Sequence, residues 1–257
     1  MSPIWARVRF YLHMVWWFLC CAFDRVFEKL IKSARLRVLI FGDGIAAGFG
    51  DYCTLADAGG LSKRVRPFLQ QDIRKGVLRT AVDFSQRGKL MRKIADFDVT
   101  DEAALSHSIG ANIDKFDVAV LVCGSFDALH FARLTDADLN EEVGKTMTKL
   151  VRMRELLRGK LQVCLLPCPS SFPKAAHEFT KQLQSAIHRE KFVIASDVSE
   201  RLSASNYFVD AVHLSSSGYK LLGADMVSSL RTALKKAEWK YLSGKMGLLR
   251  AADAKKD

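Results

Sequence analysis

The chain has 257 residues, of which 49% are hydrophobic and 10% aromatic. This length and composition exclude a disordered chain, and they suffice for one large domain with an additional segment. The formal net charge of +11 predicts anionic partners, such as lipid headgroups or an acidic protein subunit. The sequence has no zinc-finger spacing, RNA-binding signature or arginine-rich tract, so we expect no nucleic acid partner.

The first segment, residues 1–35, predicts a hydrophobic helix that attaches the protein to a membrane or to a partner. Residues 10–23 carry no formal charge before Asp24 apart from a histidine, and apolar residues continue at helical spacing as far as Ile31. Pro3 suits the start of a helix. We therefore predict one helix over about residues 3–33 that projects from the globular domain and contacts membrane lipid or subunits of a membrane complex.

Four interpretations of this segment remain open. The uncharged run is shorter than the ~20 residues that span a bilayer, and its tryptophans are typical of the headgroup region, which favours an embedded or interfacial anchor. A cleaved signal peptide, a mitochondrial address and a helix buried against a partner subunit are the alternatives. Cys20 and Cys21 suit either palmitoylation or ordinary helix packing.

The charges around the segment predict a location. More Lys and Arg follow the apolar run than precede it, which favours a globular domain on the cytosolic or matrix side. The cysteines show neither a disulfide pattern nor metal-ligand spacing, which agrees with a reducing compartment. Because residues 1–23 are basic and free of acidic side chains, we favour a mitochondrial membrane, with the endoplasmic reticulum second.

Strand and helix patterns alternate through residues 36–243, and a charged tail follows at 244–257. Apolar runs typical of buried strands lie at 37–41, 77–84, 117–123, 161–166 and 191–195. Helical patterns lie at 60–72, 101–113, 136–158, 173–189 and 215–242. This alternation predicts an α/β domain whose parallel sheet is covered on both faces, with any site at the carboxyl ends of the strands.

Short motifs follow these strands. The first strand ends in Gly42-Asp43-Gly44, a lone Gly88 follows the second, and Gly124-Ser125-Phe126-Asp127 follows the third. Asp210 and His213 precede the last helix. This set of motifs, in this order, resembles the SGNH (GDSL-type) hydrolase family over about residues 36–235. The corresponding family blocks are a Gly-Asp-Ser turn, a glycine, a Gly-x-Asn-Asp turn and Asp-x-x-His.

The resemblance implies a flavodoxin-like three-layer sandwich with five parallel strands in the order 2-1-3-4-5. It also implies that His213 is the general base and that Asp210 orients its ring. Backbone N–H groups of Gly44 and Gly88 would face the oxyanion. The other residues that the resemblance assigns to the site are the pocket residues Gly124 and Phe126 and the turn-bracing Asp43 and Asp127.

Two departures from the family pattern fall on the chemistry. Gly44 stands where the family has its serine nucleophile, and Phe126 replaces an asparagine amide with an apolar ring that we expect to fill the acyl pocket. Losing both groups removes acyl transfer. We therefore expect a catalytically degenerate protein that serves as a membrane-anchored accessory or structural subunit of a larger complex, for which a mitochondrial location is favoured.

The alternative is an active membrane-associated ester or lipid hydrolase with an unconventional nucleophile, for which Asp43 and Ser125 are the candidates. If the protein is catalytically degenerate, we expect no small-molecule substrate. It predicts no cofactor and no metal site, because the remaining histidines have no paired ligand pattern.

Overall fold

Five parallel strands form the centre of the protein, in the order β2-β1-β3-β4-β5. Their bounds are β1 (Leu36–Gly42), β2 (Val82–Gly88), β3 (Val118–Cys123), β4 (Leu161–Leu165) and β5 (Val193–Ile194). The computed structural model describes residues 3–30, 35–51, 59–78, 80–134, 138–196 and 201–253. The five-stranded parallel sheet and its strand order confirm the prediction.

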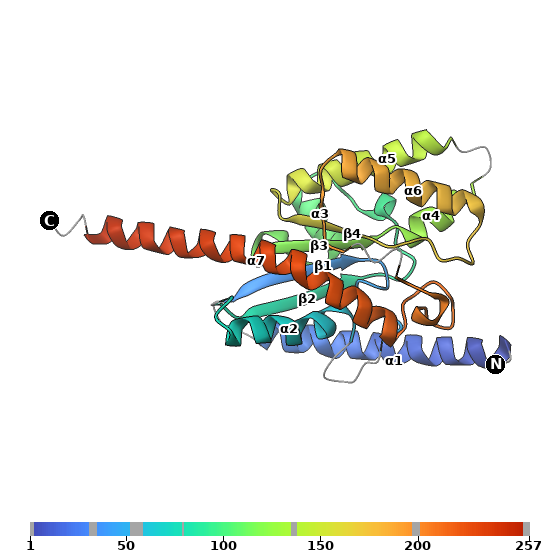
Figure 1. Ribbon diagram of the computed structural model, residues 1–257, viewed down its shortest axis with the longest axis horizontal. Coiled ribbons are helices and arrows are strands. Elements are labelled where there is room, and N and C mark those ends of the chain that lie inside the picture. The colour runs from blue at the N-terminus through green and yellow to red at the C-terminus, as the bar shows by residue number, and fades with distance from the viewer. Residues whose placement is uncertain are drawn as a thin grey trace.

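Helices cover both faces of the sheet (Figure 1). One layer contains α3 (Glu102–Ile109), α4 (Ser125–Phe131), α5 (Leu139–Leu156) and α6 (Lys174–Arg189), and the other contains α2 (Leu61–Arg74) and α7 (Ser216–Asp253). Alternate residues of β1 supply both cores, since Leu39 and Phe41 pack under the first layer and Val38 and Ile40 under the second. Because a strand covered on both faces favours apolar residues at consecutive positions, Val38, Leu39, Ile40 and Phe41 form a continuous apolar run.

β2, α4 and α7 differ from the sequence expectation in a boundary or in their existence. β2 begins at Val82 instead of residue 77, because the preceding residues are tied elsewhere: the Val77 N–H donates to Asp72 O and the Thr80 N–H to the Glu238 carboxylate. The short helix α4 was not predicted, since it lies within the glycine motif after β3. α7 continues to Asp253, through most of the stretch expected as a charged tail.

α1 (Pro3–Leu30) lies against the domain for part of its length, and the predicted projecting arrangement is therefore wrong (Figure 1). Trp17 and Cys20 are buried, and the Trp17 indole N–H donates to Ala47 O at 3.0 Å. The Gly50 N–H donates to His13 Nε2 at 2.9 Å. Periodicity indicates that a helix has an apolar face but not which surface covers it, and here the domain itself covers one face. The apolar side chains expected to extend this face, those of Val26, Phe27, Leu30 and Ile31, are not among the side chains that the structure describes.

The part of the chain that the structure describes includes no helix that is both long enough and apolar enough to cross a membrane.

Replacing Trp17 with alanine should weaken the docking of α1 by about 3–5 kcal/mol, because a buried aromatic side chain and its hydrogen bond are lost. Hydrogen exchange of the α1 amides measures this loss. Trp16→Ala is the matched control, since the Trp16 side chain is 40% exposed and its removal should have a smaller effect. Equal losses of protection in the two variants would contradict the docked arrangement.

Candidate functional site

The turn after β1 is braced by the buried carboxylate of Asp43. Its Oδ1 accepts hydrogen bonds from the Ile45 N–H at 2.8 Å and the Ala46 N–H at 3.3 Å. Gly88 packs directly against this turn, because a Cβ built at Gly88 would lie 2.0 Å from Asp43 O. The first two motifs therefore meet at the carboxyl end of β1 and β2, whose last paired residues are Gly42 and Gly88.

His213 and Asp210 form a hydrogen-bonded pair in the loop before α7. His213 Nδ1 lies 2.5 Å from Asp210 Oδ2, while Asp210 Oδ1 accepts from the backbone N–H groups of Val212 and His213. Burial alone would raise the pKa of the Asp210 carboxyl, but the hydrogen bond and charge of His213 and the two N–H groups hold that pKa below its usual value. With the proton on Nδ1, the Nε2 lone pair of a neutral His213 is available as a base.

Gly44 lies directly in front of that base. A Cβ built at Gly44 would stand 2.6 Å from His213 Nε2 and 2.8 Å from Leu90 Cδ2. Gly44 does not have the positive φ that favours glycine, so its backbone accepts a side chain while its surroundings do not. His213 Nε2 is buried and has no hydrogen-bond partner. The imidazole and Leu90 thus fill the space that a nucleophile at position 44 would need.

Aromatic rings enclose the imidazole. The ring centroid of Phe49 lies 4.6 Å from that of His213, and the ring centroid of Phe126 lies 5.4 Å from it. The His13 ring of α1 lies 5.0 Å from the Phe49 ring, so α1 forms an outer cover over this cluster. Phe126 and His213 are 5% and 3% exposed, so both rings are buried in this cluster.

The third motif forms a second braced turn beside the site. Asp127 Oδ1 accepts from the Ile94 N–H at 2.7 Å, and Asp127 Oδ2 accepts from the Gly124 N–H at 3.2 Å. A Cβ built at Gly124 would lie 2.6 Å from Leu165 Cδ1, so a side chain at this position would point toward β4 and not toward the imidazole. Ser125, the first residue of α4, has a buried hydroxyl without a hydrogen-bond partner.

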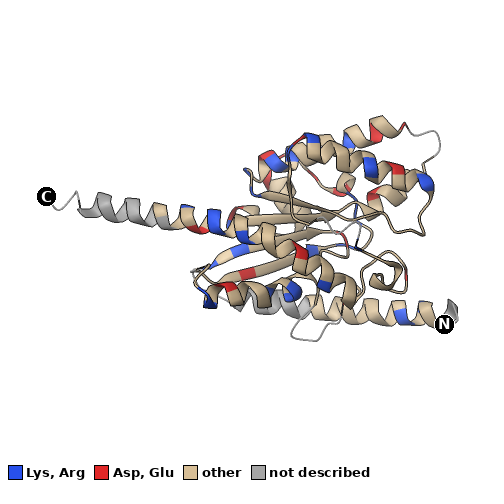
Figure 2. Cartoon of the chain, in the orientation of Figure 1, with Lys and Arg blue, Asp and Glu red and all other residues tan. Residues whose placement is uncertain are grey.

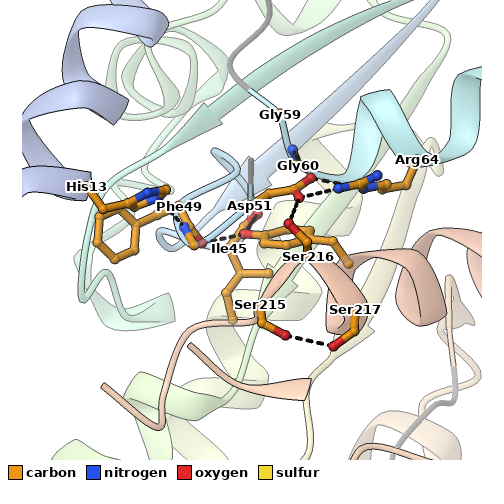
Figure 3. A network of polar contacts seen from close by, with 12 residues as sticks. His13, Ile45, Phe49, Asp51, Gly59, Gly60, Arg64, Ser215, Ser216 and Ser217 are labelled. Carbon is orange, nitrogen blue, oxygen red and sulfur yellow. Dashed lines mark hydrogen bonds and ion pairs between the residues drawn. The ribbon is translucent and has the colours of Figure 1, made fainter. Parts of the chain in front are cut away.

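The buried carboxylate of Asp51 lies beside the site and belongs to none of the sequence motifs (Figure 3). Asp51 Oδ2 accepts from the Gly60 N–H at 2.9 Å and from Arg64 Nε at 3.0 Å, and Asp51 Oδ1 accepts from the Ser216 hydroxyl at 2.7 Å. Arg64 and Ser216 belong to the first turns of α2 and α7. No local pattern links these positions, and His13 and Trp17 were likewise interpreted only as parts of an attachment helix.

The described residues include no cluster of three or more histidine, cysteine, aspartate or glutamate side chains that could hold a metal ion. The geometry of the site brings together an Asp–His pair whose Nε2 is buried and a residue 44 that has no hydroxyl.

Burial makes two of these carboxyl groups hard to ionise. It raises the pKa of Asp43 from 3.8 to about 7 and that of Asp127 from 3.8 to about 6. The folded state therefore binds these protons more tightly than the unfolded state does. The contribution of this tighter proton binding to the free energy of unfolding is fully present below pH 4. It is lost as the pH rises through about 6 to 7.

Asp43→Asn should flatten this dependence, because asparagine cannot ionise while its side-chain oxygen can still accept from Ile45 and Ala46. Between pH 4 and pH 8, the free energy of unfolding of the unmodified chain should fall further than that of Asp43→Asn. The difference between the two falls should be on the order of a few kcal/mol. Urea denaturation across this range measures it, with Asp114→Asn, an exposed carboxylate, as the control. An Asp43→Asn curve parallel to that of the unmodified chain would contradict the assignment.

No protein-family model and no curated protein matches this sequence. Several solved structures do match the fold of this chain. The chain is similar to a lipase/acylhydrolase from Enterococcus faecalis, with a TM-score of 0.54 and 21% identity over 77% of this chain and 96% of that one. It is also similar to a GDSL-like lipase from Parabacteroides merdae, with a TM-score of 0.53 and 16% identity over 77% and 97% of the two chains.

An acetyl xylan esterase from Geobacillus stearothermophilus gives a TM-score of 0.53 and 15% identity over 77% of this chain and 95% of that one. At these identities the likeness concerns the fold, and it extends over nearly the whole length of each of the three structures. Together with the strand order and the placement of the four motifs, it identifies the architecture: this chain has the fold of the SGNH (GDSL-type) hydrolases.

Proposed function

We propose that this chain is a non-catalytic member of the SGNH fold that acts as an accessory or structural subunit at a membrane surface, held there by α1. The observation that carries the proposal is the contact between Gly44 and the base: a side chain at position 44 would collide with His213 Nε2.

The loss of catalysis follows from what a serine hydrolase needs. A serine hydroxyl becomes nucleophilic only when a base within hydrogen-bond reach removes its proton. Here the Asp–His pair is assembled, but position 44 offers no hydroxyl, and Phe126 offers no amide to hold an oxyanion. The paired residues then serve packing: Asp210 ties together the loop before α7 through two backbone N–H groups and the imidazole.

Attachment through α1 is supported by the side chains that its docking leaves exposed. These large apolar residues are Trp5, Val8, Tyr11, Leu12, Val15, Trp16, Phe18 and Leu19. Residues 3–21 of α1 include Arg7 and Arg9 and no acidic side chain, as the coloured part of the helix shows (Figure 2). The domain covers only the docked face of such a helix, so its apolar outer face needs a second apolar surface to cover it. A lipid interface suits this aromatic and basic pattern. The cytosolic or matrix side of a membrane, with the mitochondrial one favoured, stays a prediction that rests on the sequence charges.

A second candidate function is ester hydrolysis with Ser125 as the nucleophile. It is favoured by one observation, that Ser125 Oγ and His213 Nε2 are both buried and both lack a hydrogen-bond partner. A reactive serine would be labelled by a fluorophosphonate, so the same reagent tests both candidates.

The unmodified chain should not react with a fluorophosphonate or cleave a short acyl ester. Gly44→Ser alone should cost about 1–3 kcal/mol of stability, because the new side chain overpacks the site. Combining Gly44→Ser with Leu90→Ala and Phe126→Asn supplies the hydroxyl, the space and the amide, and should give measurable labelling and esterase activity. A further His213→Ala change should reduce that activity at least about 100-fold. Labelling of the unmodified chain that Ser125→Ala abolishes would establish the second candidate instead.

The full chain should bind vesicles that contain anionic lipid, and Val15→Glu with Leu19→Glu should weaken this binding at least about tenfold, because two apolar side chains lose their burial in the interface. Vesicle flotation measures the bound fraction. The matched control is Leu134→Glu with Val193→Glu, which changes an exposed leucine and an exposed valine of the domain. An equal loss of binding in the control, or no binding by the unmodified chain, would contradict attachment through α1.

A further inference from the structure

Beside the enclosed imidazole, α1 and the domain form an open groove of about 640 Å³. This volume falls within the range of about 300–1,000 Å³ that is typical of small-molecule sites. The groove is distinct from the Gly44 region, and the motifs of the sequence analysis do not include it. Its lining residues come from α1, from the end of the turn after β1, and from the start and approach of α7.

The walls of the groove are apolar and elongated. Trp5, Val8 and Leu12 follow one another at helical spacing on one side of α1, and their row extends for about 10 Å along the helix. Phe208 forms the opposite side. Trp5 and Leu12 are both 67% exposed, so the groove presents apolar surface that the domain does not cover. A row of this shape suits a single alkyl chain lying along α1.

Among the described residues that line the groove, Arg9 and Asp51 carry opposite formal charges. Its carboxylate, Asp51, is neutralised by Arg64 and also accepts from Ser216 and Gly60. Its cation, Arg9, lies with its guanidinium carbon 5.8 Å from the Phe208 ring centroid, and no described carboxylate pairs with it. Because Asp51 is already paired with Arg64, Arg9 is the described charge of the groove that a ligand could neutralise, and the complementary head group is negative.

His13 adds a hydrogen-bond donor without adding charge. Its Nε2 accepts from the Gly50 N–H, which places the ring proton of the neutral form on Nδ1. Burial, with Arg9 nearby, lowers the pKa of His13, so the imidazole is neutral at neutral pH. Arg9 remains the cation that selects the ligand, and the row of apolar side chains beside it accommodates the rest.

We infer that the groove between α1 and Phe208 binds a single-chain amphiphile with an anionic head, with the head at Arg9 and the chain along Trp5, Val8 and Leu12. The inference goes beyond the proposed function, because it requires neither an inactive Gly44 site nor attachment to a bilayer.

Titration calorimetry on the full chain tests this assignment with dodecanoate, dodecyl maltoside and dodecyltrimethylammonium, each below its critical micelle concentration. The three probes share an alkyl chain and differ in head charge. Dodecanoate should bind one molecule per chain and at least tenfold more tightly than the cationic probe. Affinities independent of head charge, or binding that begins only when micelles form, would overturn the proposal.

Variants locate the site. Arg9→Gln should weaken dodecanoate binding at least tenfold and leave dodecyl maltoside unchanged, whereas Arg9→Lys should retain the preference for the anion. Arg7→Gln is the matched control on the same helix, since Arg7 does not line the groove. Leu12→Glu should weaken all three probes. An equal effect of Arg7→Gln and Arg9→Gln would overturn the assignment of the head to Arg9.

The two proposals fail separately. Val15→Glu with Leu19→Glu changes residues of α1 outside the groove, so this variant should lose vesicle binding and keep dodecanoate binding. If both are lost together in this variant while its circular dichroism is unchanged, the groove is not an independent site and the inference is wrong.

Discussion

The buried carboxylate of Asp51 joins three parts of the chain that are distant in sequence. It ends the turn after β1 and accepts hydrogen bonds from Gly60, from the Arg64 side chain in α2 and from the Ser216 hydroxyl in α7. The Tyr219 hydroxyl, also from α7, lies within hydrogen-bond distance of the Ile45 and Phe49 carbonyl oxygens. Because a buried charge that loses its partner is strongly destabilising, this network fixes the turn against both helices.

The position of that turn decides what the site can do. The same backbone that Asp51 and Tyr219 hold brings Gly44 against the imidazole and Phe49 over it. A protein interior tolerates few voids, so an active site that lacks its nucleophile side chain is expected to close. Leu90 and the ring of His213 occupy this space. The Asp210–His213 pair is fully formed beside this position, and residue 44 offers it no hydroxyl.

α1 contacts the turn beside this site with one face and exposes apolar side chains on its other face. Its inner face contributes His13 and Trp17, which bond to the backbone of the turn at Gly50 and Ala47. Its outer face is apolar and exposed, and one edge of the helix borders the groove that holds Arg9. A single helix thus contacts the residues around the imidazole and also borders the groove. The proposed attachment and the proposed ligand binding would both involve this helix.

The sequence by itself determined the parallel sheet, the identity of the Asp–His pair and the absence of a hydroxyl at position 44. These features have local signals: continuous apolar runs for strands buried on both faces, and short motifs at the strand ends. Only the tertiary structure decided that β2 begins at Val82, that α1 docks on the domain, and that Asp51 pairs with Arg64 and Ser216. It also decided that the space in front of Gly44 is filled. The physical reason is that these features depend on which distant side chains meet, and neither periodicity nor a motif specifies the partner of an apolar face or of a buried charge.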